Sequence, residues 1–429
     1  MKFQLGDTPY KFLTENSHEC DAETAFVLTK QNSKYRDDAE KNGAHSIIAL
    51  GDIAPYFGVD KIKIIGITGT NGKTTTASAL YSFLLDLGYK VALQGTRGFF
   101  MNDTTVEGKT LTTPSALTTY RHIYQATAEK CDFFIMEVSS HAIVQERIEG
   151  LKFELKILTN ITQDHLDYHN TLEEYRAVKN SFFKDDGKKL INKDEPNADF
   201  NFKNAFTYGV ENAATFKSMA YSLTGGISGV IAHFQKVEHF NSPMHGFFNL
   251  YNLMCAIAAA QLLTGKDIKE VCEVVDNFAG VSGRMQEVSK NIIVDFAHTP
   301  DGMQEAMTAL REKEMRLVFG AGGDRDKSKR ALMGKVASNL AKKIYLTSDN
   351  PRHEDPQAIV DDIMEGILES RNVEVYLSRR EAIAKAIEER EPEEIVLILG
   401  KGDEEYQIIY DKKFPFDDRE VVKEILKSL

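Results

Sequence analysis

Hydrophobic and polar residues along this chain follow patterns that predict repeated units of strand, loop and helix. The apolar run at residues 61–67 is typical of a buried strand. After a glycine-rich turn, apolar residues recur at helical spacing: Ala77, Leu80, Phe83, Leu84 and Leu87. Strand patterns at 132–138 and 155–161 and a helical pattern at 172–183 follow. The central part of the chain is therefore predicted to form a mostly parallel sheet flanked by helices.

The pattern changes twice beyond this central part. Residues 205–240 are rich in glycine and β-forming residues, which predicts a local antiparallel insertion, and residues 245–263 return to an alanine-rich helix. After residue 283 strands and helices alternate again, with strands expected at 292–296, 317–319, 344–346, 373–377 and 395–399. This second series predicts a separate unit with a Rossmann-like sheet.

These patterns predict an α/β protein of three domains. The first domain, residues 1–60, is small, polar and mixed, and ends in a turn and a short buried strand near residues 43–50. The central domain, residues 61–282, contains the strand, glycine-rich loop and helix of a P-loop ATPase. The third domain covers residues 283–429.

Composition narrows the classes of function. The chain has 429 residues, 42% of them hydrophobic, and a formal charge of −12. Such a charge argues against general attraction to nucleic acid or to an anionic membrane. The N-terminus lacks an apolar signal core, and no apolar run reaches the ~18 residues of a membrane span. We therefore expect a cytoplasmic protein, with its four dispersed cysteines reduced and mostly in the core.

The loop after the first predicted strand has the chemistry of a phosphate site. Gly69, Gly72 and Lys73 stand between a buried strand and a helix, where backbone N–H groups and the positive helix end bind phosphate. Lys73 can neutralise β- and γ-phosphate charge, and the Thr74 hydroxyl can bind Mg²⁺. The spacing is a variant, because Ile67 occupies the place of the usual first glycine. A connector without a ligand is the weaker alternative.

Further polar residues follow the ends of predicted strands. Glu137 is placed to bind a metal beside the phosphates, although such a glutamate alone is more often a solvated charge. The run at residues 159–169 gathers acidic groups and imidazoles, which suits a metal site or turn capping equally. Pro351 stiffens the loop that ends in Arg352, whose guanidinium can bind a carboxylate through two hydrogen bonds. A turn with a solvated arginine is the alternative.

Together these segments resemble one known family. Residues 68–76 resemble the nucleotide loop of the Mur ligases and of the related folylpolyglutamate synthetases. Residues 137–142 and 295–300 resemble further Mur ligase motifs, and residues 349–352 resemble the element of those family members that add meso-diaminopimelate. The resemblance runs from about residue 61 to residue 410.

The resemblance implies roles that spacing alone does not. It implies ATP binding by Gly69, Thr70, Asn71, Gly72, Lys73, Thr74, Thr75, Asn249, Asn252, Arg284, Asp295 and His298. It also implies two Mg²⁺ sites built from Thr74, Glu137, His165 and Lys179, the last as a carbamate. Lys73, Glu137, His165 and Lys179 form the implied catalytic set. Without the resemblance, the pattern predicts that Lys179 is a surface lysine and that Asn249 and Asn252 cap a helix.

The family also implies sites for the two substrates that are joined. The acceptor, a UDP-N-acetylmuramoyl dipeptide, is assigned to Thr112, Thr113, Ser139, Gln145, Arg147, Ser17 and Lys30. The usual Asp-Ser-Arg pattern near the uridine is absent, so Ser17 and Lys30 are the less specific matches. The amine, meso-diaminopimelate, is assigned to Arg325, Asp349, Asn350, Pro351, Arg352, Gly400 and Glu404. Asp403 stands where the family commonly has histidine.

The implied activity is ATP-dependent amide formation through an acyl phosphate in peptidoglycan synthesis. A monomer that acts on small molecules, without nucleic acid or membrane, is expected. Lysine-adding relatives, MurF and folylpolyglutamate synthetase remain as alternatives within the class, and Arg352 favours diaminopimelate over lysine. A kinase, or a nucleotide-gated regulatory protein without turnover, remains an alternative from another class.

Overall fold

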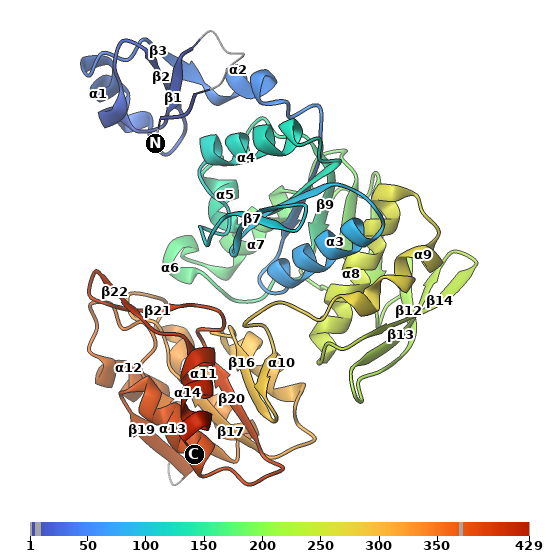
Figure 1. Ribbon diagram of the computed structural model, residues 1–429, viewed down its shortest axis with the longest axis vertical. Helices are drawn as coiled ribbons and strands as arrows, with labels where there is room; N and C mark the ends of the chain where they lie inside the picture. The colour runs from blue at the N-terminus through green and yellow to red at the C-terminus, as the bar shows by residue number, and fades with distance from the viewer. Residues whose placement is uncertain (1, 5–9, 369–371, 429) are drawn as a thin grey trace.

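The structure, a computed structural model, describes residues 2–4, 10–368 and 372–428. The described residues form sheets of three, eleven and six strands in succession along the chain, and a hairpin near the C-terminus (Figure 1). Helices pack against the two larger sheets. The predicted α/β class is confirmed, whereas the exact domain boundaries remain a prediction.

The first sheet is parallel and packs on the central unit. Its strands are β1 (Phe12–Thr14), β2 (Thr24–Leu28) and β3 (Ser46–Ala49), accompanied by the short helices α1 (Arg36–Lys41) and α2 (Leu50–Ile53). Leu13, Val27 and Phe57 share one apolar cluster with Leu117 and Tyr120 of helix α4 (Ala116–Ala128). This cluster fixes the N-terminal unit against the central one.

The eleven-stranded sheet has seven parallel strands in its middle. These are β4 (Lys63–Thr68), β5 (Val91–Gly95), β8 (Phe133–Glu137), β9 (Phe153–Leu158), β10 (Lys189–Asn192), β11 (Ala205–Gly209) and β12 (Phe216–Ser222). Antiparallel strands close both ends: β6 (Gly98–Met101), β7 (Thr104–Glu107), β13 (Ile227–His233) and β14 (Lys236–Ser242). The predicted antiparallel segment is confirmed, but it extends the main sheet because β12 pairs with β11.

Helices cover both faces of this sheet. On one face lie α3 (Lys73–Asp86), α8 (Phe247–Thr264) and α9 (Ile268–Glu273), and the other face carries α4 (Ala116–Ala128) and α7 (Leu172–Ser181). The short helices α5 (Ser140–Val144) and α6 (Leu166–His169) follow β8 and β9. Among the described helices only α8 has the length and hydropathy of a membrane span, and 67% of it is buried in the core against α3. All four cysteines are free and buried, as predicted.

The C-terminal sheet has the strand order β15-β16-β20-β17-β18-β19. Its strands are β15 (Gln286–Ser289), β16 (Ile292–Asp295), β17 (Met315–Phe319), β18 (Lys343–Thr347), β19 (Val373–Tyr376) and β20 (Ile395–Leu399). One face carries α10 (Pro300–Thr308), α11 (Ser328–Leu340) and α12 (Pro356–Met364), and the other carries α13 (Arg379–Glu388) and α14 (Asp418–Ser428). The five predicted strands are confirmed. The edge strand β15 and the hairpin of β21 (Tyr406–Ile409) and β22 (Lys412–Pro415) were missed, because short strands that are partly or wholly exposed have weak apolar patterns.

A fully buried ion pair joins three elements of the C-terminal unit. Arg379 of α13 donates two hydrogen bonds of 2.7 Å to the two carboxylate oxygens of Asp418, the first residue of α14. The same guanidinium donates to the carbonyl of Leu399 at the end of β20, at 2.9 Å. Because both side chains have no exposure to solvent, each charge depends on the other.

We expect Asp418→Ala to lower the free energy of unfolding of the C-terminal unit by about 3 kcal/mol, because it leaves the Arg379 charge buried without a counterion. Urea unfolding followed by circular dichroism measures the change, since the chain has no tryptophan. Glu420→Ala removes an exposed carboxylate from the same helix, where it pairs with Lys423, and is the matched control. Equal effects of the two substitutions would contradict the structural importance of the buried pair.

Candidate active site

The loop between β4 and α3 approaches its neighbours too closely for any side chain. A Cβ added at Gly69 would lie 1.9 Å from the Thr159 hydroxyl oxygen, and one added at Gly72 would lie 2.3 Å from the Asn252 side-chain oxygen. Gly72 also has a φ of +80°, in the left-handed region that favours glycine. The two glycines of the motif are therefore required by space and by backbone geometry.

The start of α3 provides hydrogen-bond donors for an anion. Helix α3 begins at Lys73, and Gly72 before it has no side chain with which to cap the first N–H groups. The Lys73 ammonium donates to the carbonyls of Gly69 and Thr70, both at 2.8 Å, so the lysine folds back over the loop. Burial lowers the pKa of Lys73. Free N–H groups, a helix N-terminus and a lysine together fit the phosphates of a nucleotide.

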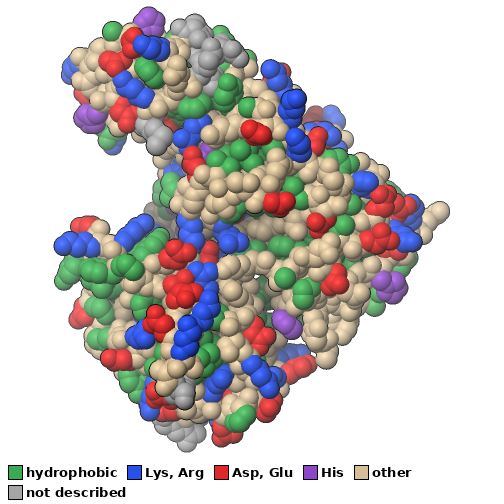
Figure 2. All heavy atoms as spheres, viewed as in Figure 1, with side chains coloured by type: hydrophobic (Ala, Val, Ile, Leu, Met, Phe, Trp, Pro, Cys, Tyr) green, Lys and Arg blue, Asp and Glu red, His purple; other side chains and the backbone are tan. Residues whose placement is uncertain are grey.

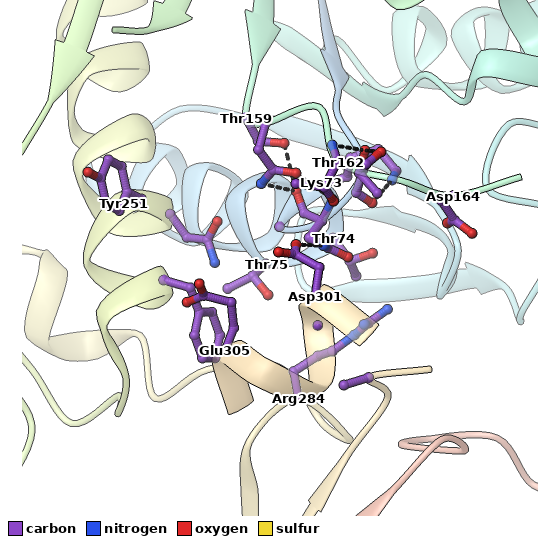
Figure 3. Close-up of a pocket in the computed structure, with 18 of the residues that line it drawn as sticks. Lys73, Thr74, Thr75, Thr159, Thr162, Asp164, Tyr251, Arg284, Asp301 and Glu305 are labelled. Atoms are coloured by element: carbon purple, nitrogen blue, oxygen red, sulfur yellow. Dashed lines mark hydrogen bonds between the residues drawn. The ribbon is translucent and has the colours of Figure 1, made fainter. Parts of the chain in front are cut away.

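A cavity of about 510 Å³ opens in front of this loop and is lined by both larger units. Figure 3 shows Arg284, Asp301 and Glu305 of the C-terminal unit facing the loop across the cavity. The Asn71 side chain donates to the Asp301 carboxylate at 3.0 Å, which joins the loop directly to α10. The Arg284 guanidinium lies 4.2 Å from the centre of the Phe296 ring. The cavity is therefore a site between two units, of a size suited to a nucleotide.

Glu137 stands at the carboxyl end of β8, next to the loop. Its carboxylate accepts from the Thr74 hydroxyl at 2.9 Å and from the Thr96 backbone N–H at 3.0 Å. The Thr96 hydroxyl in turn lies 3.1 Å from that of Thr112. A carboxylate beside a hydroxyl at a phosphate loop is a suitable pair of oxygen ligands for Mg²⁺.

The structure places Lys179 beside the loop, although its sequence pattern suggests a surface residue. The side chain is 1% exposed, and its amine donates to the Gly69 carbonyl at 2.8 Å. Burial, and secondly the Lys73 charge, lower the pKa of Lys179 well below its usual value. The His165 imidazole lies 3.4 Å from the Asp164 carboxylate. Among the described residues no group of three His, Cys, Asp or Glu side chains is arranged to hold a metal ion.

The other residues assigned to ATP lie on both sides of the cavity. Asn252 lines it. Asn249 donates to the His245 carbonyl at 2.8 Å and accepts from Asn252, and neither side chain caps the helix, because the N-cap of α8 is Gly246 and no side chain of a described residue caps its first N–H groups. Asp295 accepts from two backbone N–H groups at 2.7 Å, and burial raises its pKa. His298 lines the cavity, and burial lowers its pKa.

Four of the residues assigned to the acceptor form one connected group. The Thr113 hydroxyl donates to the Glu137 carbonyl at 2.9 Å and accepts from the Ser139 N–H at 3.0 Å. Arg147 donates to the Thr113 carbonyl at 2.6 Å. Since Thr112 adjoins this group, a bound acceptor would lie next to the Glu137 segment.

The remaining acceptor residues lie at the boundary with the N-terminal unit or inside it. Gln145 accepts from Gln31 at 2.5 Å, and Lys30 lies 3.1 Å from Glu146, so both contacts bridge the two units. Ser17 is buried within the N-terminal unit, and its carbonyl accepts from a nearby asparagine. The structure therefore does not bring Ser17 together with the Thr113 group.

The residues assigned to the amine surround one buried lysine that sequence reasoning did not select. The Lys401 ammonium has no exposure, and it lies 3.5 Å from Asp349, 3.2 Å from Asn350 and 3.0 Å from Glu404. The Asn350 amide also donates to Glu404 at 3.0 Å. A Cβ at Gly400 would lie 2.5 Å from the Asp349 carboxylate. Lys401 thus holds the loops after β18 and β20 together.

Arg352 lies at the rim of this cluster. Its guanidinium donates to the Gly323 carbonyl at 2.6 Å, and its backbone has a φ of +51°. Burial, and secondly the nearby charge of Arg325, lower the pKa of Arg352. Pro351 packs so closely on Gly323 that a Cβ there would lie 1.9 Å from the Pro351 carbonyl oxygen. Two guanidinium groups therefore lie next to two carboxylates, an arrangement that suits a zwitterionic ligand.

Sequence reasoning missed several further residues of the site. Thr96, Asn160 and Lys401 each follow the carboxyl end of a parallel strand, and this position was a signal that could have identified them. Asp164 lies in the acidic run 159–169 but was not singled out there, and Asp301 gave no such signal. Burial alone would raise the pKa of Asp164, but the positive charges around it outweigh burial and hold it at about 2.

Comparisons with known proteins agree with this geometry. Residues 67–260 match the family model described as the Mur ligase middle domain, and residues 283–402 match the Mur ligase, glutamate ligase domain. The chain is 51% identical, over 98% of its length and 97% of the relative's, to the UDP-N-acetylmuramoyl-L-alanyl-D-glutamate--2,6-diaminopimelate ligase of Wolinella succinogenes.

Solved structures show the same architecture. A structure with the same ligase name has a TM-score of 0.68 at 28% identity and covers 100% of this chain and 97% of its own. The MurF ligase of Thermotoga maritima in complex with ADP has a TM-score of 0.65 at 17% identity and covers 97% of each chain. The predicted three-domain α/β fold is thereby confirmed.

We expect Gly72→Ala to weaken binding of a non-hydrolysable ATP analogue at least about tenfold, since it combines left-handed strain with a collision at Asn252. Titration calorimetry measures the affinity. Gly88→Ala imposes the same backbone strain, φ +89°, with no heavy atom within 4 Å of the new Cβ, and should leave binding unchanged. Unchanged affinity in Gly72→Ala would show that the loop does not hold phosphate.

Proposed function

This chain belongs to the Mur ligase family, and on that premise we propose that it joins meso-diaminopimelate to UDP-N-acetylmuramoyl-L-alanyl-D-glutamate with ATP. Members of the family are ATP-dependent ligases, and the relative at 51% identity carries the name of this activity. We further propose that the protein acts in the cytoplasm, as a monomer, in peptidoglycan synthesis. The net charge of −12 agrees with a protein that does not bind nucleic acid or an anionic membrane.

The observation that carries this proposal is the cluster around Arg352 and Glu404. The far end of meso-diaminopimelate carries a carboxylate and an ammonium group, whereas lysine has only the ammonium. Arg352 and Arg325 offer guanidinium donors for the carboxylate. Glu404 and Asp349 offer oxygen acceptors for the ammonium, and Lys401 keeps them in place. Without that carboxylate the partly buried Arg352 guanidinium would lose a partner of opposite charge, which gives selectivity against lysine.

The proposed reaction has two displacements. An acceptor carboxylate oxygen attacks the γ-phosphorus of ATP, the bond to the bridging oxygen breaks, and ADP leaves with that electron pair. The amine of diaminopimelate then attacks the acyl carbon, phosphate leaves with the C–O electrons, and the amine loses a proton. Lys73 and the first N–H groups of α3 stabilise negative charge on the phosphates, while Arg147 and Thr113 orient the acceptor.

Two Mg²⁺ ions are proposed to assist. Thr74 and Glu137 would hold one ion, and His165 with Lys179 as a carbamate would hold the second. Burial lowers the pKa of the Lys179 amine and so favours its unprotonated form. This supports carbamate formation, because the unprotonated amine is the form that combines with carbon dioxide. Bound ions would supply charge neutralisation at the transferring phosphoryl group.

We expect ATP-dependent phosphate release to require both the acceptor and meso-diaminopimelate, with lysine, ornithine and D-Ala-D-Ala at least about 100-fold less effective in kcat/KM. Arg352→Lys should lower kcat/KM for diaminopimelate about 10- to 100-fold, because one ammonium replaces a two-pronged donor. Arg380→Lys changes an exposed arginine of the same unit and is the matched control.

The rival functions give different results in this assay. A nucleotide-gated regulatory protein would release no phosphate with any amine, and a kinase would give a stable phosphorylated product that hydroxylamine does not convert to a hydroxamate. Preference for lysine, D-Ala-D-Ala or a folate-linked glutamate would reassign the chain to a lysine-adding ligase, MurF or folylpolyglutamate synthetase. Any of these results would also remove the proposed role of Arg352.

A further inference from the structure

The loop after β20 reaches across to the central unit through Asp403. The Asp403 carboxylate is 11% exposed and lies 3.2 Å from the Lys109 ammonium and 3.6 Å from the Arg97 guanidinium. Lys109 also donates to the backbone carbonyl of Asp403. Both cations belong to the eleven-stranded sheet unit, so one carboxylate of the C-terminal unit is held by two residues of another unit. This pairing is separate from the Lys401 cluster next to it.

The two cations border the segment to which the acceptor is assigned. Arg97 follows Thr96, whose N–H donates to Glu137, and Lys109 lies shortly before Thr112 and Thr113. The hydroxyls of Thr96 and Thr112 lie 3.1 Å apart, which closes this segment into a loop. On the opposite side, Asp403 is directly followed by Glu404 of the amine cluster. Asp403 therefore links the amine-binding loop to the acceptor segment.

Backbone packing fixes the same loop against the link between the two larger units. Gly283, in that link, has a φ of +70°, and a Cβ there would lie 2.1 Å from the Asp403 nitrogen. A Cβ at Gly402 would lie 2.6 Å from the Gly283 carbonyl oxygen. The link and the Asp403 loop thus pack closely against each other, mainly through backbone atoms. Asp403 therefore lies where the link between the two larger units meets the amine-binding loop.

The two larger units face each other across an open region, and contacts between them fix how they are oriented. Figure 2 shows the molecule hollowed between the N-terminal and the C-terminal units, with lysine and arginine side chains exposed along the passage between them. The direct contact of Asn71 with Asp301 lies at the nucleotide cavity, on the side of α10. Asp403 supplies a further contact between the units, near the place where the two joined substrates are proposed to meet.

We propose that Asp403 is a positioning residue for amide formation, which pairs with Arg97 and Lys109 to hold the amine next to the activated acceptor. This inference rests on the proposed function, since it concerns the meeting of the same two substrates. Asp403 contacts neither substrate; its effect is on the relative placement of the loops that do. Misplacement by about 1 Å at such a distance from the chemistry can lower a rate about 10²-fold.

The test uses the full chain with Asp403→Asn, Lys109→Met and the double variant, assayed by phosphate release with the amine that supports turnover. Asp403→Asn should lower kcat/KM for the amine about tenfold, while the melting temperature stays unchanged. Lys109→Met should cost less in the Asp403→Asn background than in the wild-type protein, because the two side chains share one ion pair. Asp411→Asn, an exposed carboxylate of the same unit, is the matched control.

A charge exchange gives a second, independent measurement. Asp403→Lys alone should abolish the contact by repulsion, and Asp403→Lys combined with Lys109→Asp should recover part of the lost kcat/KM. Raising the salt concentration from 0.05 to 0.5 M should lower the rate of the wild-type protein more than that of Asp403→Asn, as expected for a screened ion pair with a Debye length shrinking to roughly 4 Å.

Three outcomes would overturn the inference. The effects of Asp403→Asn and Lys109→Met on kcat/KM could prove additive, or the charge exchange could recover none of the lost kcat/KM. Asp403→Asn could also lower kcat/KM no more than Asp411→Asn does. If no amine supports turnover, the proposed function fails, and the inference is then judged by small-angle scattering alone. Scattering should show a more extended Asp403→Asn than wild type in the presence of the ATP analogue, and identical profiles would reject the link.

Discussion

The close packing of the Gly69–Gly72 turn is the constraint on which the rest of the site depends. The turn lies against Thr159 at the end of β9 on one side and Asn252 of α8 on the other. These contacts fix where α3 begins, and hence where its unpaired N–H groups and Lys73 point. Glu137 and Lys179 then take their places relative to that turn, through the Thr74 hydroxyl and the Gly69 carbonyl.

The second level of organisation is the joining of the two larger units. The Lys401 cluster holds the loops after β18 and β20, and the Arg379–Asp418 pair attaches the end of β20 to two helices. The amine cluster is therefore rigid within its own unit. Its position relative to the loop depends on a few polar contacts between units, of which Asn71 with Asp301 is the one at the nucleotide cavity.

The sequence predicted the parts of this arrangement that depend on local pattern. Gly72 and Lys73 follow a buried strand and precede a helix, so their chemistry was readable from neighbouring residues alone. The strands at 292–296 and 395–399 were likewise found from their apolar runs, although β16 ends at Asp295. The role of Lys179 could not be predicted in this way, because its side chain is buried only through the packing of α7 against the loop. The Asp301 and Asp403 contacts depend on the placement of whole units, which no local pattern records.

The contact between Asn71 and Asp301 has a thermodynamic consequence. Asn71 belongs to the phosphate-binding turn and also to the boundary between the units, so nucleotide binding cannot be independent of how tightly the units associate. If association of the two units raises the affinity for nucleotide by some factor, bound nucleotide raises the equilibrium constant for that association by the same factor. Occupancy of the nucleotide site is thereby coupled to the region where the other two substrates are proposed to meet, in part through the Asn71 side-chain amide.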